Sequence, residues 1–179
     1  MARITPPEGG ISVFDYNPEL WEKFNEFYGY LWTHGALDQA TKESARLRNA
    51  RVTGCAICRN LRFDGAREEG LTEDYVEQIV DGYEQSTLPE RWKSAVRWTD
   101  TVIGFPADAT AAQRDALERE FSRPELVELT FAAAIAQGFS KAAVAWGPPE
   151  DIPVTVVPTP APGTTVTDGS THAPAAAAS

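Results

Sequence analysis

The sequence predicts an all-α protein. Apolar residues recur mainly at helical spacing, helix-capping residues precede most of these stretches, and glycine or proline follows them. The chain has 179 residues, of which 42% are hydrophobic and 23% charged, as is typical of a folded globular domain. We expect one helical domain, residues 1–149, followed by an extended or flexible C-terminal tail, residues 150–179.

The first expected helix begins after Asn17, a favourable N-cap, with Pro18 in its first turn. Apolar side chains then recur at helical spacing, and further aromatic residues widen this stripe, so we expect more than one face to be buried. Most of the stripe is expected to be core, and part of it is a candidate for lining an apolar pocket. Its members are Leu20, Trp21, Phe24, Phe27, Tyr28, Leu31 and Trp32. His34 is expected to cap or pack near the end of this helix.

Two helices are expected in the next part of the chain. The first runs from about Asp38 to Thr53, where Gly54 interrupts it. The second is expected to begin at the two cysteines and to reach about Glu69, ending at Gly70.

Two more segments follow with their apolar residues on one helical face. Thr72 is the expected cap of the first segment, and Pro89 precedes the second. The shared face of the first contains Val76, Ile79, Val80 and Tyr83, and that of the second contains Trp92, Ala95, Val96, Thr99, Val102 and Ile103.

Two capping boxes mark the last helix starts, Thr110 with Gln113 and Ser122 with Glu125. The second box opens the longest expected helix, about 123–146, which ends at Gly147. Small residues on this helix would allow close approach of another helix, either in the bundle centre or between subunits. They are Ala132, Ala133, Ala134, Ala136 and Gly138.

The composition changes at residue 150, because proline recurs in the segment that follows. Proline prevents a continuous helix there, so we expect an extended arm or a flexible tail. Its apolar start, 152–157, is a candidate for lying on a neighbouring surface, and the rest is expected to be mobile.

The balance of charge argues against two classes of partner. The net charge of −10 opposes binding to nucleic acid and to anionic membranes, since both require basic patches. The N-terminal sequence MARITPPEGG lacks the pattern of a secretory signal, and we expect a cytoplasmic protein. In a reducing compartment, a Cys-x-x-Cys pair is more often catalytic or metal-binding than a permanent disulfide.

Cys55 and Cys58 are the candidate reactive groups, and a redox pair, a metal site or two buried thiols are the alternatives. At i and i+3 of a first helical turn they share a face, where unpaired backbone N–H groups stabilise a thiolate. Arg62 would lie at i+4 from Cys58 as a cationic neighbour and possible thiolate stabiliser. Zinc needs four ligands, and beyond the cysteines the chain offers His34 and His172, so we expect no metal and no cofactor.

Glu43 precedes Cys55 by twelve residues on the preceding expected helix. A turn at Gly54 could bring its carboxylate back toward the thiols. The alternative is a simple ion pair with Arg46 or Lys42 on the same helix.

These residues together resemble the carboxymuconolactone decarboxylase and alkylhydroperoxidase D (AhpD) superfamily. The resemblance rests on the string from Lys42 to Ala50 followed by Gly54-Cys55-x-x-Cys58, on Leu31-Trp32-x-His34-Gly35-x-Leu37, and on Ala145-Trp146-Gly147-Pro148-Pro149. It covers most of residues 18–149. It implies an all-α bundle of the AhpD-like type and a homo-oligomer, a trimer or hexamer.

The resemblance also implies roles for individual residues. Cys58 would be the peroxidatic thiol, Cys55 the resolving thiol and Glu43 the proton-relay carboxylate. The peroxidase branch carries a histidine four residues after the second cysteine, and this chain has Arg62 there. Arginine does not exchange a proton near neutral pH, so Arg62 could hold a thiolate but not relay its proton.

Two functions from different classes follow. The first is a thiol-dependent oxidoreductase, an alkylhydroperoxidase-like peroxidase with an antioxidant role, which reduces a small-molecule hydroperoxide and is recycled by an unknown dithiol electron donor. The second is an oligomeric small-molecule-binding or lyase-like relative whose cysteines are not catalytic.

Overall fold

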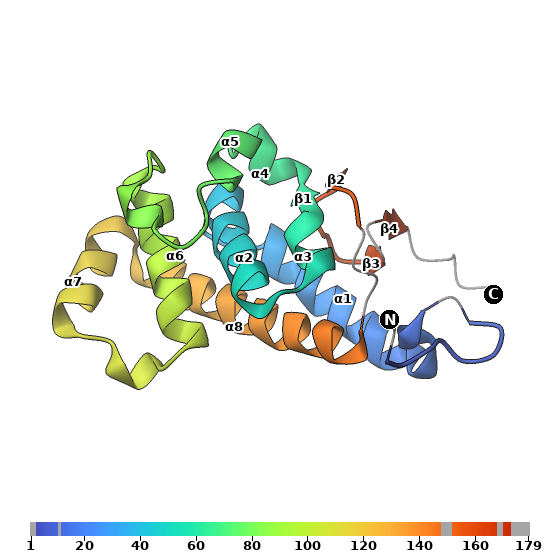
Figure 1. Ribbon diagram of the computed structural model, residues 1–179. Helices are drawn as coiled ribbons and strands as arrows, with labels where there is room; N and C mark the ends of the chain where they lie inside the picture. The colour runs from blue at the N-terminus through green and yellow to red at the C-terminus, as the bar shows by residue number, and fades with distance from the viewer. Residues whose placement is uncertain (1–2, 11, 148–151, 168–169, 173–179) are drawn as a thin grey trace.

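The computed structural model describes residues 3–10, 12–147, 152–167 and 170–172 of the chain. It is mainly helical, which confirms the predicted fold class (Figure 1). The α-helices are α1 (Pro18–Thr33), α2 (Gln39–Thr53), α3 (Ala56–Asn60), α4 (Asp64–Glu68), α5 (Glu73–Val76), α6 (Glu90–Ile103), α7 (Ala111–Glu120) and α8 (Arg123–Trp146). Short 3-10 turns are η1 (Val13–Tyr16), η2 (Tyr83–Gln85) and η3 (Pro106–Asp108), and the strands are β1 (Leu61–Phe63), β2 (Thr155–Val157), β3 (Thr165–Thr167) and β4 (Ser170–His172).

The predicted helix ends are confirmed where the sequence carries capping chemistry. Asn17 and Asp38 accept backbone N–H groups at the starts of α1 and α2, and both capping boxes are present at α7 and α8. Gly54 and Gly147 end α2 and α8 in the left-handed conformation, with φ of 70° and 77°.

Helix α2 is the centre of the molecule, with α8 and α6 packed against it (Figure 1). It is buried continuously from Ala40 to Ala50, although many of these side chains are polar. Its charges are therefore paired: the Lys42 ammonium lies 2.7 Å from the Glu128 carboxylate of α8 and also donates to the carbonyls of Leu31 and Trp32. Such buried ion pairs fix how the helices pack.

The prediction of one helix from the cysteines to Glu69 is wrong. The chain forms the five-residue helix α3, then the strand β1, then α4. Tertiary contacts account for the break, because β1 pairs in parallel with β2, Leu61 opposite Thr155 and Phe63 opposite Val157. The three residues of β1 are a small exception to the expected all-helical domain.

Burial corrects other expectations. After Thr72, regular helix ends at Val76, and Val80 is exposed while its expected neighbours Ile79 and Tyr83 are buried. In the stripe of α1, Leu20 and Phe27 are exposed. On α8, Ala132, Ala133 and Ala136 are buried as expected, but Ala134 and Gly138 face outward.

The start of the C-terminal segment is an extended arm on the helical domain. Besides the β1–β2 pairing, Asn60 donates to the Ile152 carbonyl at 2.7 Å, and Thr159 donates its backbone N–H and its hydroxyl to Asp64. This confirms that the apolar start of the segment lies on a neighbouring surface. The rest of the segment, from residue 158 on, is predicted by the sequence to be mobile. Strands β3 and β4 form a short antiparallel ladder within it, and residues 168–169 and 173–179 fall outside the described residues.

None of the helices in the described ranges combines the length and apolar character needed to cross a membrane.

Candidate functional site

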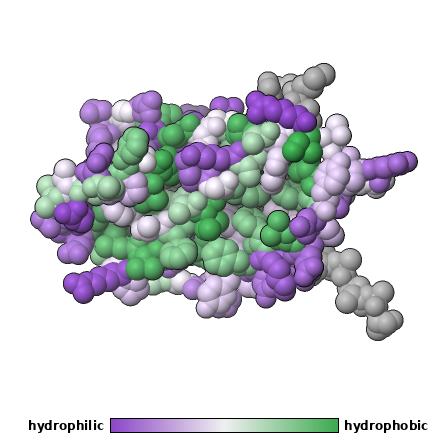
Figure 2. Space-filling model, turned by 90° about the horizontal axis from the view of Figure 1, so that it is seen from below, coloured by the Kyte–Doolittle hydropathy of each residue, from purple (hydrophilic) through white to green (hydrophobic). Residues whose placement is uncertain are grey.

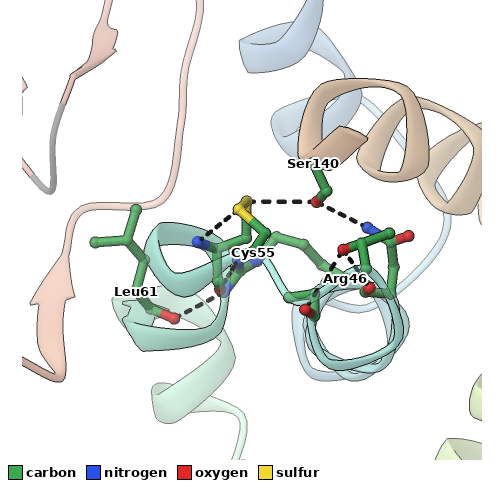
Figure 3. Close-up of a disulfide and its surroundings, with 8 residues drawn as sticks. Arg46, Cys55, Leu61 and Ser140 are labelled. Atoms are coloured by element: carbon green, nitrogen blue, oxygen red, sulfur yellow. Dashed lines mark hydrogen bonds between the residues drawn. A yellow bond between two sulfur atoms is a disulfide. The ribbon is translucent and has the colours of Figure 1, made fainter. Parts of the chain in front are cut away.

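The two cysteines lie in a tight turn between α2 and α3. Gly54 reverses the chain, and the backbone N–H of Cys55 returns to the Ala50 carbonyl at 3.0 Å. Cys55 is the N-cap of α3, and its sulfur accepts the backbone N–H of Cys58 at 3.3 Å. The two residues are joined as a disulfide with their Cα atoms 5.3 Å apart, a separation typical of disulfides (Figure 3).

A cavity of about 350 Å³ opens beside this disulfide, and Cys58 is part of its wall. Cys55 is fully buried and is not among the described residues that line the cavity. The two sulfurs therefore differ in access to a small molecule, although they are adjacent.

Aromatic side chains from four elements, η1, α1, β1 and α8, form much of the cavity wall. Phe14 of η1 stacks on Trp21 with ring centroids 3.5 Å apart, Trp21 on Phe24 at 5.3 Å, and Phe24 on Tyr28 at 5.4 Å. Phe139 of α8 stacks on Phe24 at 5.0 Å. Part of the α1 stripe thus lines an apolar pocket, which was the alternative to a core position, and such a wall favours an apolar ligand.

Polar groups in the wall are few. Burial raises the pKa of Tyr28 to about 12, so this phenol stays protonated near neutral pH. Arg46 contributes a guanidinium, and Ser140 of α8 contributes a hydroxyl.

Glu43 and Arg46 form a buried ion pair under the cysteine turn. Arg46 holds both carboxylate oxygens of Glu43 at 2.6 Å and donates to the carbonyls of Cys58 at 2.5 Å and Leu61 at 2.7 Å (Figure 3). Coulombic attraction to Glu43 raises the pKa of Arg46 although burial opposes it.

The sequence left two alternatives for Glu43, an approach of its carboxylate to the thiols or an ion pair on its own helix. Glu43 pairs with Arg46, as one alternative proposed, but the pair is buried rather than on the surface. Its Oε1 also accepts the Phe63 backbone N–H at 3.3 Å. Glu43 thus reaches the Cys58 carbonyl through Arg46, and it is not among the described residues that line the cavity.

Arg62 lies in β1, so it is not one helical turn beyond Cys58 as the sequence suggested. Its guanidinium is buried, with Nε 3.1 Å from both oxygens of Glu73, and it donates to the carbonyls of Arg59 and Leu61. Within the described part of the chain it does not line the cavity.

Sequence reasoning missed Ser140 and Asn49. The Ser140 hydroxyl lies 3.4 Å from the Cys58 sulfur, and the Asn49 amide nitrogen lies 3.0 Å from the Ser140 oxygen (Figure 3). Both side chains are buried. The available signal was their polarity at core-facing helical positions, where an unexplained polar residue indicates a specific contact.

Among the described residues, no group of three or more histidine, cysteine and acidic side chains is placed to hold a metal ion. His34 is the exposed C-cap of α1, where its Nδ1 lies 2.7 Å from the Thr33 hydroxyl and its ring stacks on Tyr30. The expectation of a capping role for His34 is confirmed.

Comparison with known proteins agrees with this arrangement of helices and cysteines. The model of the carboxymuconolactone decarboxylase family matches residues 18–101, which include Glu43 and both cysteines. Over this segment the chain is similar to that family. The family resemblance expected from the sequence is therefore confirmed.

Two curated relatives of this chain are uncharacterised proteins from two strains of Mycobacterium tuberculosis. Each is 35% identical over 124 residues, which is 69% of this chain and 43% of the relative. The chain thus spans less than half the length of these relatives.

Solved structures with the same fold include a protein of unknown function from Agrobacterium tumefaciens, suggested to be the antioxidant defence protein AhpD. Its TM-score is 0.66 at 20% identity, with 79% of this chain and 97% of that chain covered. A peroxidase-related protein from a Silicibacter species has a TM-score of 0.64 at 15% identity, with 75% and 71% covered. Together they show that the helical fold is AhpD-like.

Proposed function

We propose that this chain is a thiol-dependent oxidoreductase that reduces a hydroperoxide, with Cys58 as the peroxidatic thiol and Cys55 as the resolving thiol. The observation that carries the proposal is the difference between the two sulfurs: Cys58 lines a cavity, whereas Cys55 is fully buried. A substrate in the cavity meets Cys58 first. The peroxidase-related name of one structural neighbour agrees with this chemistry.

The proposed cycle begins with the reduced cysteines. The Cys58 thiolate attacks the terminal oxygen of ROOH, so an S–O bond forms, the O–O bond breaks, and the leaving alkoxide takes up a proton to give ROH. Cys58 is then a sulfenic acid. The Cys55 thiolate attacks its sulfur, forming the disulfide, and the displaced hydroxide is protonated to water. An external dithiol reduces the disulfide and is itself oxidised.

The family resemblance assigns the proton relay to Glu43, but Arg46 separates Glu43 from the cysteine turn and does not pass a proton near neutral pH. We therefore assign Glu43 to holding that turn through Arg46, and we assign the protons of the cycle to solvent. The aromatic cavity wall favours an apolar organic hydroperoxide over hydrogen peroxide, because burying an apolar group there contributes about 1–3 kcal/mol to discrimination.

The test uses the full chain, first reduced and freed of reductant. One equivalent of cumene hydroperoxide should lower the mass by two hydrogens and yield cumyl alcohol. Cys55→Ser should stop at a sulfenic acid that dimedone traps, and Cys58→Ser should not consume peroxide. With a small dithiol as donor, kcat/KM should be about tenfold higher for cumene hydroperoxide than for hydrogen peroxide.

One result would reverse the proposal. If the native thiols stay reduced in excess cumene hydroperoxide while an apolar ligand binds the cavity, the chain is a small-molecule-binding protein. The continuous aromatic stack from Phe14 to Tyr28 is the feature that favours this second function.

A further inference from the structure

We infer that the Ser140 hydroxyl donates a hydrogen bond to the Cys58 thiolate, and that the Asn49 amide holds the hydroxyl in that orientation. Ser140 would then stabilise the attacking form of the sulfur directly, with Asn49 as a positioning residue. The role of Ser140 in turnover rests on the proposed function. The hydrogen bond itself is a statement about the acidity of the Cys58 thiol and can be tested separately.

The direction of the hydrogen bonds carries the argument. The Asn49 Nδ2 group donates to the Ser140 oxygen at 3.0 Å. A hydroxyl has one hydrogen, and an oxygen that already accepts keeps that hydrogen for another partner. The Cys58 sulfur at 3.4 Å is that partner, so the chain runs from amide to hydroxyl to sulfur (Figure 3).

Two other buried helical hydroxyls behave differently. Ser44 donates to the carbonyl of Ala40, and Thr99 to that of Ala95, each four residues earlier and each at 2.8 Å. This back-bond is the usual partner of a buried serine or threonine in a helix. Ser140 is also buried in a helix, but its hydrogen is directed to Cys58.

Asn49 gives a second, independent observation. Its side chain is fully buried, and its Oδ1 atom lacks a hydrogen-bond partner among the described residues. An unpaired buried oxygen lowers stability, so a site with this arrangement is not optimised for stability alone. Asn49 does donate one N–H to the Ser140 oxygen of α8, and this is what orients Ser140.

Neither of the nearby arginines, Arg62 and Arg46, donates a hydrogen bond to the Cys58 sulfur within the part of the chain that the structure describes. Arg62 is bound to Glu73 and to two backbone carbonyls. Arg46 is bound to Glu43 and reaches the Cys58 carbonyl rather than the sulfur. A neutral hydroxyl at the sulfur supplies a hydrogen bond to the thiolate that strengthens when the charge forms.

The experiment measures the pKa of Cys58 in full-length Cys55→Ser, from thiolate absorbance and from alkylation rate against pH. Adding Ser140→Ala should raise the pKa by about one unit, the size expected for loss of one charge-assisted hydrogen bond. At pH values well below the pKa, the alkylation rate should fall about threefold. The fraction of Cys58 present as thiolate decreases, but each thiolate is more nucleophilic. Ser140→Thr keeps the hydroxyl and should keep the pKa.

Two further variants make the result specific. Asn49→Ala removes the amide that holds the Ser140 hydroxyl, adds no charge, and should raise the Cys58 pKa by less than Ser140→Ala does. Ser44→Ala, which removes another buried hydroxyl from the core, should leave the Cys58 pKa unchanged. Circular dichroism checks folding, and if Ser140→Ala does not fold, the Asn49→Ala result decides.

An unchanged Cys58 pKa in folded Ser140→Ala would overturn the inference even if hydroperoxide is reduced. A raised pKa upholds it even if no hydroperoxide is consumed, in which case the proposed function fails alone.

Discussion

Glu43 and Arg46 illustrate how burial gives individual residues their importance. The pair is almost completely buried, and its hydrogen bonds reach the carbonyls of Cys58 and Leu61. A buried charge that loses its partner retains the full cost of its desolvation. The cysteine turn therefore depends on this pair for its position.

Glu43→Gln should accordingly lower the free energy of unfolding by about 3 kcal/mol, because Arg46 keeps its charge without a carboxylate. Urea unfolding measures this. Glu26→Gln is the matched control, since Glu26 pairs with Lys23 on the surface and its loss should cost about 0.5 kcal/mol or less. Equal effects of the two variants would contradict the argument.

Gly35 is a second residue whose identity follows from packing. A Cβ at this position would lie 1.9 Å from Oε1 of Glu128. That carboxylate cannot move away freely, because Lys42 and the backbone N–H groups of Ala36 and Leu37 bind it. The glycine in the string before α2 is thus explained by close approach.

Gly35→Ala should lower stability by about 2 kcal/mol, as expected for overpacking of a well-packed site. In a Glu128→Ala background the added methyl has room, so the same change should cost almost nothing. A double-mutant cycle of unfolding free energies measures the difference. Equal costs in both backgrounds would show that Glu128 is not the obstacle.

At the scale of the elements, Arg91 of α6 joins the starts of two other helices. It binds Asp38, the N-cap of α2, and Glu125 in the capping box of α8. Hydrogen bonds from Ser122, together with Arg91, lower the pKa of Glu125 to about 2. A carboxyl group whose pKa falls on folding stabilises the protein above its unfolded pKa, and this stabilisation is lost as the pH falls toward the folded value.

Glu125→Gln should therefore lower stability by about 1 kcal/mol at neutral pH, the size of a solvent-accessible cap. The difference from the unmodified chain should shrink between about pH 4.5 and pH 2. Chemical unfolding across this range measures it.

Gln113→Ala is the control, because it removes the other capping box, which has no titrating carboxyl. Its effect on the unfolding free energy should not change over the same pH range. If the effect of Glu125→Gln were also independent of pH, this would argue against the lowered pKa of Glu125.

At the scale of the whole molecule, apolar residues remain on the surface. Figure 2 shows hydrophobic side chains gathered in the middle of the face seen from below, the side where α8 lies in Figure 1. On α8, Val127 and Phe131 are 61% and 54% exposed, and Ala134 and Gly138 continue outward at helical spacing. A continuous apolar stripe of this kind is typical of a contact surface.

We expect this stripe to lie between subunits, so light scattering should give about three or six times the chain mass of 19.5 kDa. Phe131→Glu should shift the mass toward the monomer, because a charge at a buried interface is desolvated without a partner. Phe105→Glu is the control, since Phe105 is 79% exposed but is the N-cap of η3 and not part of α8. A monomer at micromolar concentration would contradict the expectation.

The sequence by itself determined the helical class and most helix ends, because Asn17, Asp38, the two capping boxes, Gly54 and Gly147 act on the adjacent backbone. It also identified the cysteine pair and Glu43 through the family resemblance. These features depend on residues close together in the chain or on a recurring motif.

Only the tertiary structure decided the break after Asn60, the pairing of Arg62 with Glu73 and the contact of Ser140 with Cys58. Each depends on a partner distant in sequence: β2 for β1, α5 for Arg62, and α8 for the cysteine turn. Helical spacing places Arg62 beside Cys58 only if the helix continues, and the pairing of β1 with β2 replaces that helix with an extended strand. Local propensity could not reveal this, because the hydrogen bonds and burial gained on docking the arm act through space rather than along the chain.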